Sequence, residues 1–195
     1  MKEKNIIFKK IFIISIILII VFISANKLES YQQKKAMMNA YINTMLGKIN
    51  FCKNSLYFID DWNLNDDNTP VQYDSLIEEI RFMKDFNSYT AMYMNRYKNS
   101  DIFYRISESF RMIEMLVNAG LNEEGGFISD GVISENEKLF LDNLYNDLLE
   151  LEKNLYDYEE NKEKNIISLK VYSDIMLDFT NKYSLENIKN IFVCN

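Results

Sequence analysis

The stretch IFIISIILIIVFISA, from Ile11 to Ala25, holds fifteen residues without a charge and decides how the rest of the chain is placed. As an α-helix it spans about 22 Å, which is shorter than the roughly 30 Å hydrocarbon core of a bilayer. Apolar residues at 6–8 extend it, and Lys9, Lys10 and Lys27 lie where their ammonium groups can reach the lipid headgroups. We therefore predict a transmembrane helix at Ile11 to Ala25.

The charges before this stretch predict its orientation. Residues 1–10 carry four lysines against the single acid Glu3, so the positive-inside rule keeps this short tail in the cytoplasm. Residues 26–195 then form an extracytoplasmic domain, anchored to the cell membrane by an uncleaved signal. The alternative is a cleaved signal peptide and a secreted protein, with Ser24 and Ala25 as the small-residue cleavage site. The bulky Ile23, three positions before such a cut, disfavours this alternative.

The composition of residues 26–195 narrows the class of protein. They carry 18 basic and 28 acidic residues, a net charge of −10, which argues against nucleic acid or anionic lipid as the main partner. One Pro and five Gly in the whole chain disfavour an all-β fold and favour long helices. The chain has no His, which excludes His-based catalytic triads, the usual zinc sites and a His general base.

Residues 28–61 carry apolar side chains at alternating spacings of four and three. The pattern is typical of a long helix packed in a bundle or coiled coil, and Lys35 is its one break. The helix begins soon after Ala25, so it is placed to continue the membrane helix without interruption. The seam consists of Met38, Ile42, Met45, Ile49, Cys52, Leu56 and Ile59, with Leu28 and Tyr31 continuing it backwards.

A second helix is predicted from the capping signals Thr69, Pro70 and Gln72 to about Lys98. It has two apolar faces, which predicts contact with two neighbours. One face holds Leu76, Ile80 and Met83, and the other holds Phe82, Phe86, Tyr89 and Tyr93.

Asn99 to Asp101 open a third helix, which ends near Gly120. Ser134 and Glu137 form a capping box at the start of a fourth. Residues 134–183 form either one helix or two separated by a break near Asn161, and the usual length of globular helices favours the break. The seam in this region holds Leu141, Leu144, Leu148, Leu151, Leu155 and Tyr158, and its phase resumes at Leu169, Tyr172, Met176, Phe179 and Tyr183. The predicted fold is all-α, an N-terminal transmembrane helix followed by an antiparallel bundle of four or five helices.

Two sets of residues are candidates for a disulfide or a metal site. Cys52 and Cys194 are the only cysteines, and either form a disulfide that ties the carboxyl terminus to the first helix or leave Cys52 as a small buried apolar residue. Asp61, Asn63 and Asn65 match the first three ligand positions of a calcium loop. The match is weak, because Asp66 stands where the loop needs Gly and Gln72 where it needs Glu, so we expect no metal.

No catalytic or cofactor site emerges. Acid pairs such as Glu78 with Glu79 and Glu159 with Glu160 have no spacing that selects them over solvated helix faces, and we expect no enzyme. A tail of ten residues is too short for a signalling domain, so the leading hypothesis is an interaction or scaffold module for another envelope protein. The alternative is a ligand-binding, sensor-like ectodomain with an apolar pocket inside the bundle. Regular heptad seams also fit a homo-oligomer.

Overall fold

The computed structural model describes residues 2–59, 69–95, 97, 99–119, 134–157, 162–164, 168–184 and 186–187, and their side chains except those of 2–14, 58, 59, 69–72, 119, 162 and 163. Within these residues the chain forms helices and one pair of short strands. Their order is α1 (Lys2–Ile59), α2 (Thr69–Met94), α3 (Asp101–Ala119), α4 (Glu135–Leu155), β1 (Tyr156–Asp157), β2 (Lys162–Glu163) and α5 (Leu169–Lys182).

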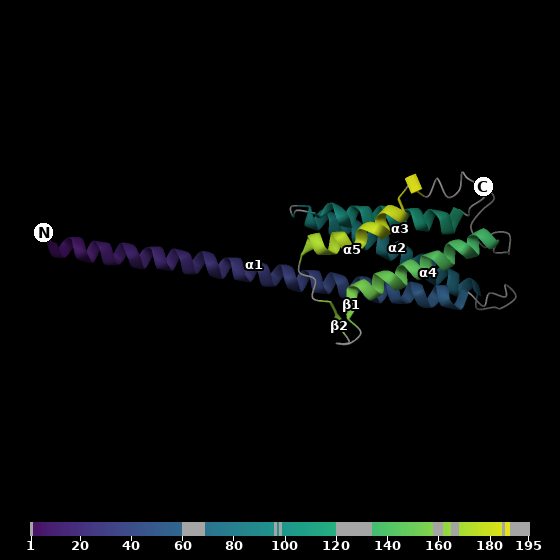
Figure 1. Ribbon diagram of the computed structural model, residues 1–195, viewed down its shortest axis with the longest axis horizontal. Coiled ribbons are helices and arrows are strands. Elements are labelled where there is room, and N and C mark those ends of the chain that lie inside the picture. Colours follow the sequence, from purple (N-terminus) through teal and green to yellow (C-terminus); the bar gives the residue numbers. More distant parts are fainter. Residues whose placement is uncertain are drawn as a thin grey trace.

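The helices form a bundle around one hydrophobic core, which confirms the all-α bundle of the predicted fold class (Figure 1). The prediction that the bundle is antiparallel does not hold throughout, because α3 and α5 run parallel: Phe103 packs against Tyr172, and Phe110 packs against Phe179. α1 lies between α2 and α4, α3 lies between α2 and α5, and α5 closes the ring against α4. Each helix contributes a stripe of buried side chains to the core. The bundle follows from this, because an amphipathic helix is stable only when its apolar face is covered.

α1 runs without interruption from Lys2 to Ile59, and its first part projects beyond the bundle (Figure 1). The predicted seam is buried where the bundle covers it, since Met38, Ile42, Met45, Ile49, Cys52 and Leu56 are each at most 5% exposed. Its backward continuation is not buried, because Leu28 and Tyr31 are 59% and 50% exposed. That part of the prediction is wrong: the helices that bury the seam begin to pack against α1 only beyond these two residues.

Among the described residues, no helix combines the length and the apolarity needed to cross a membrane. The transmembrane helix predicted at Ile11 to Ala25 is therefore not confirmed.

α2 has two neighbouring helices, as predicted, but it does not bury both of its apolar faces. Leu76, Ile80 and Met83 are at most 1% exposed. On the other face Phe82, Tyr89 and Tyr93 are 40%, 72% and 68% exposed. The two neighbours, α1 and α3, leave most of the aromatic face open to solvent.

A tight turn connects α2 to α3. α2 ends at Met94, four residues before the predicted Lys98, and the amide of Tyr97 donates to the Met94 carbonyl over 2.9 Å. Asn99 has a φ of 66°, a left-handed conformation in which asparagine is enriched. α3 begins at Asp101, within the stretch Asn99 to Asp101 that was predicted to open it, whereas its predicted end near Gly120 lies outside the described residues.

α4 begins with the predicted capping box. The Glu137 amide donates to Oγ of Ser134 over 3.3 Å, and the Ser134 amide donates to Oε2 of Glu137 over 2.8 Å. α4 ends at Leu155, so the predicted break between two helices is also confirmed. The break contains an antiparallel pair, β1 with β2, in the register Tyr156 to Glu163 and Asp157 to Lys162. Strands of two residues are too short to leave a periodic signal in the sequence.

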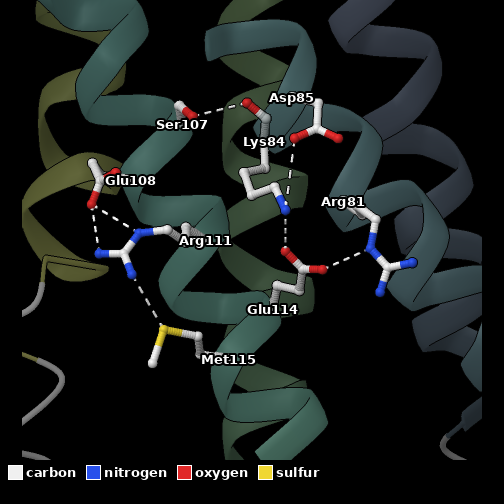
Figure 2. A network of polar contacts seen from close by, with 8 residues as sticks. All are labelled: Arg81, Lys84, Asp85, Ser107, Glu108, Arg111, Glu114 and Met115. Atoms are coloured by element: carbon white, nitrogen blue, oxygen red, sulfur yellow. Dashed lines mark hydrogen bonds and ion pairs between the residues drawn. The ribbon is translucent and has the colours of Figure 1, made fainter.

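A polar network fixes α2 against α3 (Figure 2). Glu114 on α3 accepts hydrogen bonds from Nε of Arg81 over 2.8 Å and from Nζ of Lys84 over 2.7 Å. Ser107 donates to the Lys84 backbone carbonyl over 2.9 Å. These contacts lie between two neighbouring helices and explain their alignment without a ligand.

Candidate functional site

The fold leaves open a hollow of about 750 Å³ between α1 and α2, which we call the α1–α2 groove. It lies at the end of the bundle where α1 enters it (Figure 1). α1 contributes Met37, Met38, Ala40, Tyr41 and Thr44, α2 contributes Phe86, Tyr89, Thr90, Met92, Tyr93 and Met94, and α3 contributes Phe103.

The lining of the groove contains no charged side chain. Its α2 rim is open to solvent, since Tyr89, Met92 and Tyr93 are 72%, 70% and 68% exposed. Single exposed apolar residues are common on the surface of a monomer. Three large ones exposed within five residues form a contiguous patch, which is typical of a binding surface. Tyrosine and methionine are also enriched at protein interfaces, where methionine adapts its shape to a partner.

Three hydroxyls in the wall of the groove, those of Tyr41, Thr44 and Thr90, are already hydrogen-bonded within the protein. Thr44 donates to the Ala40 carbonyl over 3.0 Å, and Thr90 donates to the Phe86 carbonyl over 2.7 Å. The hydroxyl of Tyr41 points into the bundle. These three side chains therefore offer little hydrogen bonding to an occupant. Apart from the phenols of Tyr89 and Tyr93 on the rim, apolar contact dominates what the wall can recognise.

Tyr41, Asn87 and Tyr172 form a buried polar cluster on the core side of the groove wall. The Tyr41 hydroxyl donates to Oδ1 of Asn87 over 2.5 Å and lies 2.9 Å from the hydroxyl of Tyr172. Nδ2 of Asn87 donates to the Met83 carbonyl over 2.7 Å. Burial raises the pKa of Tyr41 well above its ordinary value, with a further contribution from Tyr172, and burial also raises the pKa of Tyr172. Both phenols therefore stay neutral and hold the groove wall in place.

Each end of the groove has a lysine from α1, and the two lysines differ in whether a carboxylate pairs with them. Lys48, one turn beyond Thr44, lies 2.8 Å from Oε2 of Glu79. Lys34, one turn before Met37, lies 4.9 Å from the ring centroid of Tyr97. Among the described residues no carboxylate pairs with Lys34. Among the residues that the structure describes, the lysine at one end of the groove is thus paired with a carboxylate and the lysine at the other end is not.

The exposed face of α1 beside the groove contains a glycine that the fold itself does not explain. A Cβ added to Gly47 would meet no atom within 4 Å. Glycine in the middle of a helix costs about 0.5–1 kcal/mol relative to alanine. This face has no charge between Lys35 and Tyr57, and its exposed residues are Ala36, Ala40, Asn43, Gly47, Asn50, Phe51 and Asn54. It would let another helix approach closely.

The structure does not bring the sequence-predicted site residues together. Asp61, Asn63 and Asn65 lie outside the described residues, as does Cys194. Cys52 is buried with no exposed area, and its pairing with Cys194 stays a prediction. In the described part of the chain, no group of three or more Cys, Asp and Glu side chains is arranged to hold a metal ion.

The sequence does not predict the groove, although it does indicate the aromatic face of α2 that forms one side of it. The aromatic face of α2 predicts a packing surface, and nothing in the pattern indicates which helix covers it. Tyr41 and Tyr57 both lie beside the seam of α1 in the sequence, yet Tyr41 is only 5% exposed and Tyr57 is 67% exposed. Comparisons with protein-family models, curated proteins and solved structures found no match to this chain.

Proposed function

We propose that this protein is a membrane-anchored extracytoplasmic module that binds another envelope protein, and that the α1–α2 groove receives a helix of that partner. The observation that carries the proposal is the groove itself, an open apolar hollow of about 750 Å³ whose rim is formed by exposed tyrosine and methionine. Grooves of this chemistry bind the apolar face of an amphipathic helix through anchor side chains at positions i, i+4 and i+7.

The dimensions of the groove fit such a helix. Its lining extends from Met37 to Thr44 along α1 and from Phe86 to Met94 along α2, which corresponds to about 10 and 12 Å of helix. Anchors at i and i+7 lie about 10.5 Å apart. The absence of a side chain at Gly47 supports close approach of the same partner helix just beyond the groove.

The projecting part of α1 supports the membrane anchor. From Ile16 to Ile23, eight consecutive large apolar side chains are 42–67% exposed. Such a surface is unfavourable in water and needs an apolar cover. We propose that a bilayer covers residues Ile11 to Ala25 and that the lysines of residues 1–10 keep the N-terminus cytoplasmic. Extraction of the membrane fraction with alkaline carbonate, together with the intact mass of the protein, distinguishes the anchor from a signal peptide cleaved near Ala25.

The docking proposal is tested by photo-crosslinking in intact cells with the full-length, carboxyl-tagged protein. A photoreactive phenylalanine replaces Tyr93 on the groove rim or, as a control, Tyr104, which is 60% exposed on α3 outside the groove. We expect one reproducible envelope protein attached at position 93 and not at 104. Ala40→Trp, which fills the groove, should abolish that product, whereas Asn143→Trp, at an exposed position of α4, should not. Recovery of the protein alone, or only with itself, contradicts the proposal.

The second candidate function is a ligand-binding ectodomain, which the size of the groove favours because ligand sites occupy about 300–1,000 Å³. A thermal-shift screen of apolar compounds on the full-length protein tests it. A compound that stabilises the wild type but not Ala40→Trp, together with no protein crosslink at position 93, would favour this alternative.

A further inference from the structure

We propose that the partner helix carries a carboxylate that pairs with Lys34, so that charge fixes which end of the helix lies at the membrane side of the α1–α2 groove. This inference rests on the proposed function, because it names the chemistry of the partner for the same site. It starts from the difference between the two lysines that flank the groove.

The apolar part of the groove lining does not determine in which direction a helix lies along it. The lining is uncharged, and the hydroxyls of Thr44 and Thr90 donate to carbonyls of their own helices. Apolar anchors at i, i+4 and i+7 would fill the hollow nearly equally well in either direction. Charged groups at the ends of the groove therefore distinguish the two directions more strongly than its uncharged lining does.

Lys48 cannot supply that specificity, because its charge is already compensated. Its ammonium lies 2.8 Å from Oε2 of Glu79, and it also lies 4.3 Å from the ring centroid of Phe82. A partner carboxylate at this end would meet the charge of Glu79 as well as that of Lys48. Like charges brought together in this way oppose binding.

Lys34 offers the opposite situation. Its ammonium lies over the ring of Tyr97, a contact that holds the charge at this end without neutralising it. Lys34 also borders a second hollow on the projecting part of α1, together with Lys27, Ser30 and Tyr31. A carboxylate one turn beyond the last apolar anchor of the partner helix would lie beside Lys34 and complement its charge.

The test uses the full-length protein in nanodiscs of neutral lipid and a fluorescent helical peptide as the probe. The peptide has leucine anchors at i, i+4 and i+7 and one Glu a turn beyond the last anchor, and a second version has Lys in place of this Glu. Binding is measured by anisotropy. We expect the Glu peptide to bind the wild type about two- to five-fold more tightly than the Lys peptide, as for a partly exposed ion pair.

Charge reversal of the protein makes the test specific. Lys34→Glu should invert the preference between the two peptides. Lys35→Glu is the control, because this neighbouring, half-buried residue makes the same charge change but lies about 100° around the helix. It should leave the preference unchanged.

The possible failures are distinguishable. If neither peptide binds, or if Ala40→Trp does not reduce binding, the groove does not take a helix and the proposed function fails. If both peptides bind in the groove with equal affinity and Lys34→Glu changes neither, only the charge pairing is overturned. If Lys34→Glu instead reduces binding of the protein to anionic vesicles without changing peptide preference, Lys34 serves a lipid surface and the inference is wrong.

Discussion

The hydroxyl of Tyr41 on α1 donates a hydrogen bond to Oδ1 of Asn87 on α2 over 2.5 Å, in the interior of the bundle. The same hydroxyl lies 2.9 Å from the hydroxyl of Tyr172 on α5. One phenol thus joins three helices, and its ring forms part of the groove wall. Satisfied buried polar groups fix a unique packing, whereas unsatisfied ones are strongly destabilising.

Tyr41→Phe should destabilise the protein by about 1–3 kcal/mol, because Oδ1 of Asn87 and the hydroxyl of Tyr172 would both lose a partner while buried. Tyr172→Phe leaves the bond between Tyr41 and Asn87 in place, and we expect a smaller loss of about 0.5–1.5 kcal/mol. Urea unfolding of the full-length protein in detergent, followed by circular dichroism, measures both free energies. Equal losses of unfolding free energy for the two variants would contradict the central role of the Tyr41 hydroxyl in this cluster.

Ser134→Ala should destabilise α4 by about 0.5–2 kcal/mol, because it removes the acceptor for the Glu137 amide in the capping box. Ser168→Ala is the matched control. Ser168 is the N-cap of α5, but its side chain accepts no capping hydrogen bond. The same unfolding measurement should find little change for this control, and similar losses for both variants would contradict the prediction.

Gly47→Ala should stabilise the isolated protein by about 0.5–1 kcal/mol, because alanine is the better helix former and its Cβ meets no atom within 4 Å. The variant should also weaken capture of the partner through a crosslinker at Tyr93. Thermal unfolding and the crosslink yield measure the two effects. A stabilised variant with an unchanged yield would remove the support that this glycine gives to close approach of a partner helix.

Glu114 should make stability depend on pH in the acid range. Burial raises the pKa of this carboxyl, but hydrogen bonds from Lys84 and Arg81 outweigh burial, so its pKa lies below the ordinary value. A lowered pKa in the folded state stabilises the protein above the ordinary carboxyl pKa, and this contribution is lost as pH falls through the folded value. Glu114→Gln should therefore be less stable than wild type near neutral pH, and the difference should vanish in strong acid. The exposed Glu150→Gln provides the control in acid titrations followed by circular dichroism.

Cys52 should be unreactive in the folded protein. Its side chain has no exposed area, and burial together with the charge of Glu79 raises the pKa of the thiol, so little thiolate forms. Alkylation without reductant, followed by intact mass, should leave Cys52 unmodified until the protein is unfolded. The number of adducts after unfolding then decides the predicted pairing with Cys194, because two adducts exclude a disulfide.

The seams at Met38 to Leu56 and at Leu141 to Leu155 are predictable because apolar side chains at spacings of three and four must lie on one face of a helix. The capping box at Ser134 and the break before Leu169 also follow from local chemistry or helix length. Each of these features depends on residues close together in the chain, so the sequence by itself determined them.

Only the tertiary structure decided which faces are covered. Leu28 continues the seam of α1 and Tyr89 continues the aromatic face of α2, yet both are exposed, because coverage depends on where distant helices begin and end. Tyr41, Asn87 and Tyr172 come from three helices, and no local pattern predicts their meeting. The groove has the same origin: it exists because α1 and α3 pack against α2 without covering its aromatic face.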